Sequence, residues 1–266
     1  MSSVCHNKTQ SGVGLESAKS QGTPREHEEK DANHADSWDL EKIAIEEVTR
    51  ILSSFCASLP YVAIMPELKL VYFNARGRAE LARWILAYGN IAYTDERIEM
   101  DDWPEKKKTI PTGKVPVLMV DEKPLPQSMA IARYLAHLAN LVPEDPLEAA
   151  YCDALTDTLS DVAAEGYKIM FSSKTEDEKK QEYREQFFPN IMKPVLERLE
   201  KRLSNREWFA SQLTWADLMI SMVFGEVHKR KPEMLQPYPS VVALSLKVRD
   251  LPNIKKWVES APETKF

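Results

Sequence analysis

Residues 68–88, LKLVYFNARGRAELARWILAY, decide the fold of this chain. The first part, LKLVYF (68–73), is a short run of apolar and β-branched side chains that predicts a buried strand. The second part, RAELARWILAY (78–88), predicts a helix. Its apolar side chains fall on one helical face: Leu81, Trp84, Ile85 and Tyr88. A strand that leads directly into an amphipathic helix indicates a small α/β unit.

The residues that follow extend this unit. We expect a strand at 91–99, a short polar helix or turn at 101–109, a buried strand at 115–120, and a brief edge strand after the turn at 121–123. Pro124 and Pro126 are expected to terminate that edge strand, and Gln127 to open a helix. The order β-α-β-α-β-β-α predicts a mixed sheet with helices on its faces.

The strand patterns stop after Pro143. Only helical patterns follow, at 146–172, 175–203, 214–229, 238–250 and 252–260. A small α/β part and an all-helical part cannot form one layered sheet. We therefore predict two domains, at 65–142 and 146–266.

The first 64 residues differ in composition from this body. Residues 1–37 have few apolar side chains and no aromatic one, which predicts disorder. Residues 38–58 carry apolar side chains at helical spacing, with Ser37 as a candidate N-cap. This amphipathic helix could pack on the body, lie on a membrane or bind a partner, or it could be only partly formed. Its acidic polar face argues against anionic lipid.

Overall composition excludes several classes of protein. The 266 residues include 35 Lys plus Arg and 41 Asp plus Glu, a net charge of −6 that is the wrong sign for a bulk nucleic-acid binder. No apolar run approaches the length of a membrane span, and no secretory signal is evident. The three cysteines (Cys5, Cys56, Cys152) are too far apart for a disulfide framework or a metal site. We expect a cytoplasmic protein.

Several polar residues stand out in the α/β part. Tyr72 lies near the carboxyl end of the first strand, where ligands bind in open α/β sheets, although a core tyrosine would look the same. Arg76 and Arg78 precede or open a helix, where the helix dipole disfavours a cation unless an anion lies nearby. Gln127 and Ser128 open another helix, whose free N–H groups suit a carboxylate or an ordinary cap.

Two loops complete the pattern. Trp103 and Lys107 place an indole donor and a cation on one of them. In the other, Val115-Pro116 precedes a buried strand and could be cis, which would expose the backbone of Val115 to an extended ligand. These features together predict two anion sites, a backbone pairing edge and a phenol around one end of the sheet.

Five separated motifs resemble the sigma-class glutathione transferases. They are MPELKLVYFNARGRAELARWILAYGN (65–90), DDWPEKK (101–107), GKVPVL (113–118), QSMAIARYLA (127–136) and LTWADL (213–218). The family includes glutathione-dependent prostaglandin D synthases, arthropod sigma enzymes and lens S-crystallins. The resemblance covers Met65–Phe266 but not residues 1–64. It implies a thioredoxin-like N-terminal domain, an all-α C-terminal domain, a homodimer and glutathione as co-substrate.

The resemblance also implies a role for each matching residue. Tyr72 would donate a hydrogen bond to the sulfur of glutathione, with Arg78 beside it. The remaining glutathione-binding positions would be Trp103 and Lys107 for the glycine carboxylate, Val115 with its neighbours Gly113 and Lys114 for the cysteinyl backbone, Gln127 and Ser128 for the γ-glutamyl carboxylate, and Asp161 of the partner subunit for the amine. The electrophile pocket would comprise Phe73, Gly166, Tyr167, Phe171 and Phe266.

The expected activity is conjugation of the glutathione thiolate to hydrophobic electrophiles, lipid-peroxidation products among them. The alternatives are glutathione-dependent isomerisation of prostaglandin H2 to D2, and a structural or ligand-holding role like that of the S-crystallins. No Cys-x-x-Cys lies near the first helix, which excludes a glutaredoxin. Vertebrate prostaglandin D synthases carry a metal-binding acidic cluster. Its middle position here is Ser160, so we expect no metal site.

Overall fold

The computed structural model describes residues 45–50 and 65–264. The chain divides into two compact units, Met1–Ile64 and Met65–Phe266. In the first unit residues 45–50 are helical, as the sequence predicts. The predicted disorder of residues 1–37 and the rest of the predicted helix 38–58 lie outside the described residues.

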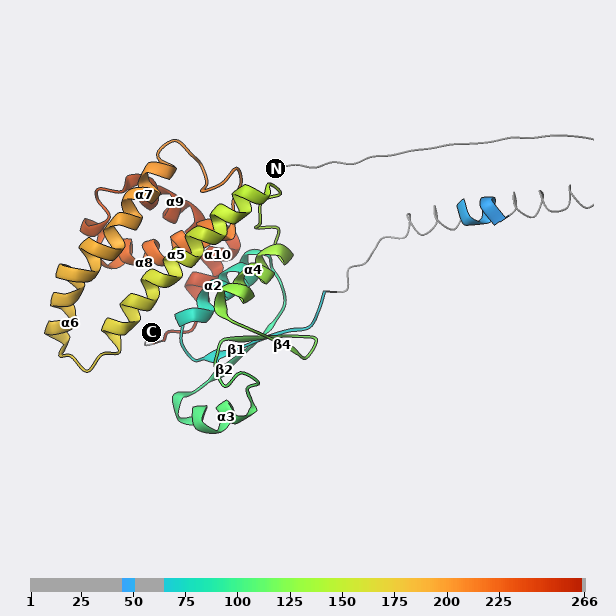
Figure 1. The fold of residues 1–266 in the computed structure, drawn as a ribbon, viewed down its shortest axis with the longest axis horizontal. Coiled ribbons are helices and arrows are strands. Elements are labelled where there is room, and N and C mark those ends of the chain that lie inside the picture. Colours follow the sequence, from blue (N-terminus) through green and yellow to red (C-terminus); the bar gives the residue numbers. More distant parts are fainter. Residues whose placement is uncertain (1–44, 51–64, 265–266) are drawn as a thin grey trace, which may run out of the picture. The chain divides into compact units, whose positions relative to one another are not determined.

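A four-stranded mixed sheet is the centre of the α/β part (Figure 1). Its strands are β1 (Leu68–Phe73), β2 (Thr94–Ile98), β3 (Val117–Val120) and β4 (Lys123–Pro126), in the order β2-β1-β3-β4. β1 is parallel to β2 and antiparallel to β3, and β4 is antiparallel to β3. The predicted edge strand is present and ends at Pro126, whereas Pro124 lies within β4 and does not terminate it. An edge strand tolerates proline because one side of it needs no ladder hydrogen bonds.

Helices pack on this sheet and lie in the segments that connect its strands. They are η1 (Gly77–Ala79), α2 (Glu80–Tyr88), η2 (Met100–Asp102), α3 (Trp103–Thr109) and α4 (Ser128–Leu138). α2 packs against α4 and buries Trp84 and Ile85 completely. The strand–helix order predicted from residues 68–138 is therefore confirmed, and the fold is a thioredoxin-like domain.

From residue 146 onward, all the described secondary-structure elements are helices. These are α5 (Pro146–Met170), α6 (Glu176–Glu182), η3 (Tyr183–Met192), α7 (Lys193–Leu203), α8 (Trp215–Arg230), η4 (Pro232–Met234), α9 (Pro239–Arg249) and α10 (Pro252–Ser260). η3 is a π-helix that contains Pro189, so the pattern predicted at 175–203 comprises three segments. α8 and α10 both pack against α2, which joins the helical part to the sheet.

Buried polar contacts define the start of α8. Asp217 is fully buried and accepts hydrogen bonds from the backbone N–H groups of Phe209 (2.7 Å) and Thr214 (2.8 Å) and from the Thr214 hydroxyl (2.7 Å). Thr214 and Asp217 form a capping box at the start of α8, and its role is structural.

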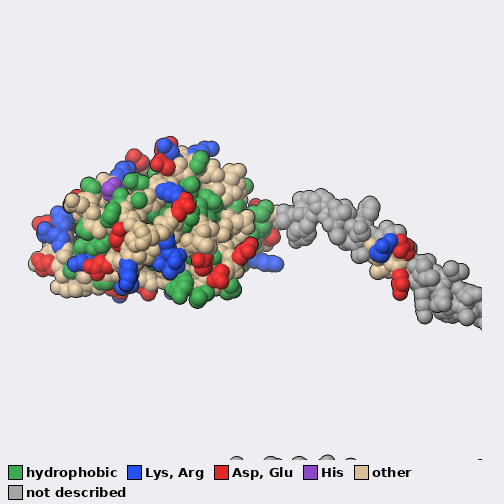
Figure 2. Space-filling view, turned by 90° about the horizontal axis from the view of Figure 1, so that it is seen from above, with side chains coloured by type: hydrophobic (Ala, Val, Ile, Leu, Met, Phe, Trp, Pro, Cys, Tyr) green, Lys and Arg blue, Asp and Glu red, His purple; other side chains and the backbone are tan. Residues whose placement is uncertain are grey.

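The surface carries mixed charge. Figure 2 shows acidic and basic side chains interspersed with apolar ones over the face of the body that it presents. Within the described residues, every helix is too short or too polar to cross a bilayer.

Candidate active site

Tyr72 is the first functional residue that the fold places. Its side chain is 8% exposed at the carboxyl end of β1, and its hydroxyl oxygen accepts the backbone N–H of Arg78 at 3.1 Å. Because the amide occupies a lone pair, the phenolic proton is left to donate elsewhere. Gly77 makes this approach possible. With φ +39°, it would place a Cβ 2.6 Å from the Tyr72 hydroxyl.

Arg78 and Tyr167 lie on the α5 side of Tyr72. The Arg78 guanidinium carbon is 5.8 Å from the centroid of the Tyr167 ring, and that ring is 6.1 Å from the ring of Phe171. Burial raises the pKa of Tyr167, with a further contribution from Tyr72 that Arg78 opposes. The site therefore places the side chains of two tyrosines beside one arginine.

α3 and the loop before β3 meet beside the same strand end. Trp103 contacts Phe73 edge to face at 5.0 Å between ring centroids. Lys107 lies near Gly113, where an added Cβ would be 3.7 Å from its Cε. The Val115–Pro116 bond is cis, as the sequence suggested. α3 therefore places the Trp103 ring against Phe73 at the end of β1, and Lys107 beside the loop that precedes β3.

The start of α4 differs from an ordinary capped helix. Gln127 has φ +77° and ψ 115°, and its side chain makes no capping hydrogen bond. A glutamine with positive φ is strained, and such strain concentrates at binding sites. The first N–H groups of α4 at Ser128 therefore lack a side-chain cap and remain suited to an anion.

Other predicted residues are less constrained by the structure. Asp161 is exposed on α5. Gly166 lies against Phe187, whose ring would be 3.5 Å from an added Cβ. Phe171 is 67% exposed, and Phe266 lies outside the described residues.

The acidic face of α5 contacts a cation from α4. Arg133 lies 2.9 Å from Asp153 and 3.9 Å from Asp157. Among the residues that the structure describes, no group of three His, Cys, Asp or Glu side chains could hold a metal ion.

Two cavities lie elsewhere in the body. One, of about 370 Å³, lies between α5 and η3 and includes Ile169 and Phe187 in its lining. The other, of about 740 Å³, lies where β1 and β2 begin and includes Tyr93. Neither is lined by Tyr72.

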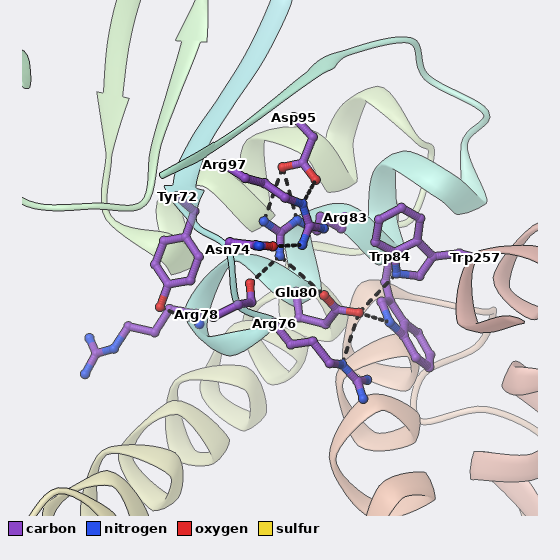
Figure 3. A network of polar contacts seen from close by, with 11 residues as sticks. Tyr72, Asn74, Arg76, Arg78, Glu80, Arg83, Trp84, Asp95, Arg97 and Trp257 are labelled. Atoms are coloured by element: carbon purple, nitrogen blue, oxygen red, sulfur yellow. Dashed lines mark hydrogen bonds and ion pairs between the residues drawn. The ribbon is translucent and has the colours of Figure 1, made fainter. Parts of the chain in front are cut away.

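Sequence reasoning missed a buried polar network behind the loop between β1 and α2 (Figure 3). Glu80 is 3% exposed and accepts hydrogen bonds from the indoles of Trp84 (3.1 Å) and Trp257 (3.0 Å). Arg83 is fully buried and donates to the carbonyl of Ala75 at 2.7 Å. The signal was present in the sequence, because Glu80 and Arg83 interrupt the apolar pattern of the first helix.

Arg76, which precedes the first helix, pairs with carboxylates of the protein itself. Arg76 lies 3.4 Å from Glu80 and 3.6 Å from Glu226 of α8. These carboxylates offset the unfavourable position of a cation at a helix start. Neither carboxylate belongs to the loop, because Glu80 is the first residue of α2 and Glu226 lies on α8.

Comparisons with known proteins give matches over both parts of the body. Residues 68–137 match a family model described as glutathione S-transferase, N-terminal domain, and residues 160–261 match one described as glutathione S-transferase, C-terminal domain. Human hematopoietic prostaglandin D synthase is 40% identical over 207 residues, covering 76% of this chain and all of the relative. The probable glutathione S-transferase 6 of Caenorhabditis elegans is 35% identical over 208 residues, with coverage of 76% and 100%. The solved structure of rat hematopoietic prostaglandin D synthase with a quinoline has a TM-score of 0.68 and 39% identity, again over 76% of this chain and 100% of that one.

Proposed function

Because the chain belongs to the glutathione S-transferase family, we propose that it binds reduced glutathione beside Tyr72 and transfers the thiolate to hydrophobic electrophiles. One observation carries the proposal. The hydroxyl oxygen of Tyr72 accepts the Arg78 amide at 3.1 Å, which orients the phenol and leaves its proton for the sulfur.

The chemistry requires a thiolate. A thiol is a weak nucleophile until it ionises, and a hydrogen bond from Tyr72 to the sulfur stabilises the ionised form. Arg78 adds positive charge beside it. A thiol pKa lowered by about two units corresponds to about 2.7 kcal/mol. The C–S bond then forms as the leaving group departs, and the thiol proton goes to solvent.

The rest of the tripeptide fits the other predicted positions. Trp103 and Lys107 would hold the glycine carboxylate, and the backbone of Val115, between Lys114 and the cis proline, would pair with the cysteinyl part. Gln127 and Ser128 would receive the γ-glutamyl carboxylate at the uncapped start of α4. The site needs no metal for this binding.

Assembly and location follow from the same proposal. The protein would act as a homodimer in the cytoplasm, and Asp161 of the partner subunit would meet the γ-glutamyl amine. Residues 65–142 would form the glutathione-binding domain and 146–266 the domain that completes the electrophile pocket. Tyr167 and Phe171 support that pocket, since Tyr167 lies against Arg78.

The test is glutathione consumption with an aromatic halide, comparing the native chain with Tyr72→Phe. Loss of one hydrogen bond to the developing thiolate should lower turnover by roughly tenfold to a thousandfold. The matched control is Tyr93→Phe, which removes a partly buried phenol at the opposite end of the same sheet. Equal activity in the native and Tyr72→Phe proteins would contradict the proposal.

A second candidate is the isomerisation of prostaglandin H2 to D2 with glutathione as cofactor. It is favoured by the 40% identity to human hematopoietic prostaglandin D synthase over the whole length of that relative. Product analysis separates the two, because isomerisation leaves glutathione unconsumed and conjugation consumes one glutathione per electrophile.

A further inference from the structure

The loop that carries Arg78 is held by residues from both parts of the body (Figure 3). From the sheet side, the Asn74 side chain bonds to Arg97 (3.2 Å) and to Glu99 (2.8 Å). From α2, the buried Arg83 donates to the carbonyl of Ala75. The residues that precede Gly77 are therefore held by the sheet and by α2, in addition to any contact from the helical part.

Glu226 supplies the contact from the helical part. Its side chain is 22% exposed on α8 and lies 2.7 Å from Arg249, 3.6 Å from Arg76 and 3.8 Å from Arg230. Burial raises the pKa of Glu226, but the hydrogen bond from Arg249 and the charge of Arg76 outweigh it and lower the pKa. Glu226 is therefore an ionised carboxylate that faces three guanidinium groups.

Arg249 fixes the position of that carboxylate. Its side chain is 15% exposed and packs closely over Gly225, where an added Cβ would lie 2.7 Å from both Cδ and Nη1. The guanidinium carbon is also 5.6 Å from the ring centroid of the buried Trp84. α8, α9 and α2 thus hold Glu226 firmly against Arg76.

We propose that Glu226 is a positioning residue for the activation of glutathione. It holds Arg76, and through Arg76 it keeps the Arg78 amide on the Tyr72 hydroxyl. An amide that donates to a phenol oxygen makes the phenol a better donor, since hydrogen bonds in a chain polarise one another. The inference rests on the proposed role of Tyr72, and it gives the helical domain a role in lowering the pKa of the glutathione thiol.

The experiment compares Glu226→Gln with the native chain in two measurements. The first is kcat/KM with an aromatic halide, which should fall by about tenfold to a hundredfold because small displacements at a reacting centre are costly. The second is the pKa of the bound glutathione thiol, followed by the ultraviolet absorbance of the thiolate, which should rise. The matched control is Glu207→Gln, which removes a carboxylate that also pairs with a cation of α9, Lys247, but forms no ion pair with the described residues of the loop between β1 and α2.

A double-mutant cycle with Arg76→Gln isolates the route. If Glu226 acts through Arg76, the two substitutions together should raise the thiol pKa no further than Arg76→Gln alone. A lower melting temperature with an unchanged thiol pKa in Glu226→Gln would overturn the inference, as would fully additive effects. These outcomes are distinct from a failure of the proposed function, in which Tyr72→Phe itself would leave the thiol pKa unchanged.

Discussion

The buried position of Cys152 suppresses the reactivity of its thiol. It is fully buried on α5, and burial raises the pKa of its thiol to about 11, with a Thr214 hydrogen bond opposing the effect and Asp217 adding to it. The thiol is therefore protonated at pH 8, and the native protein offers no nucleophilic sulfur at this position. Cys152 is the only cysteine within the described residues, and its inert thiol is consistent with a nucleophile supplied by glutathione.

This environment predicts an inert cysteine. In a Cys5→Ser, Cys56→Ser variant, a chromogenic disulfide at pH 8 should not react with the native protein and should label one thiol after unfolding in urea. Because the folded pKa lies above the ordinary value of 9.0, the contribution of Cys152 to stability should be present below pH 9 and lost as the pH rises toward 11. Rapid labelling of the native variant would contradict this prediction.

The sequence predicts side chains for the candidate site but not the backbone contacts that hold them. Tyr72 and Gln127 were predictable because each stands where a strand ends or a helix begins. The hydrogen bond from the Arg78 amide was not, because it depends on the path of the loop through Gly77. The position of a polar residue in a strand or helix can be predicted from the sequence pattern of that element. The distance between an amide and a hydroxyl depends on the three-dimensional positions of both groups.

The start of α8 carries the clearest prediction at the level of an element. Asp217→Asn replaces a buried acceptor of three hydrogen bonds with an amide that cannot accept them all. The free energy of unfolding should fall by about 2–3 kcal/mol, because bonds to a charged group are among the stronger ones and their loss leaves buried donors unpaired. Urea unfolding measures this change.

Activity provides the contrast for the same substitution. Asp217 contacts Phe209 and Thr214 but no residue of the proposed glutathione site, so kcat/KM of Asp217→Asn should remain within about twofold of the native value at temperatures where the variant is folded. A large loss of turnover with normal stability would give this carboxylate a catalytic role instead of a structural one.

The limits of sequence analysis are also clearest in the elements. Apolar periodicity predicts α4 and α5, which each bury one face, and also α2, which is buried on nearly all sides, but it treats residues 175–203 as one helix. The π-helical segment with Pro189 depends on how the backbone absorbs an extra residue per turn, which side-chain periodicity does not report. The burial of Glu80 and Arg83 was not predicted for a related reason, since each has a partner on another element, Trp257 on α10 and Asp95 on β2.

The whole body depends on contacts between distant parts of the chain. Glu80 on α2 accepts a hydrogen bond from Trp257 on α10, and Arg76 before α2 meets Glu226 on α8. The sheet and the helical part therefore share one polar network at the edge where Tyr72 lies. Stability and the geometry of the site should respond together when this junction is changed.

At the scale of the whole chain, the prediction concerns whether residues 1–64 are needed for folding and activity. Met65–Phe266 is one compact unit, and relatives such as human hematopoietic prostaglandin D synthase are covered over 100% of their length by 76% of this chain. Residues 65–266 should therefore fold alone and keep kcat/KM for glutathione and an aromatic halide within about twofold of the full chain, since the core and the proposed site both lie within them. A truncated protein that stays folded by circular dichroism but loses most of its turnover would assign the first 64 residues a part in catalysis, whereas unchanged turnover would limit them to tethering or binding elsewhere.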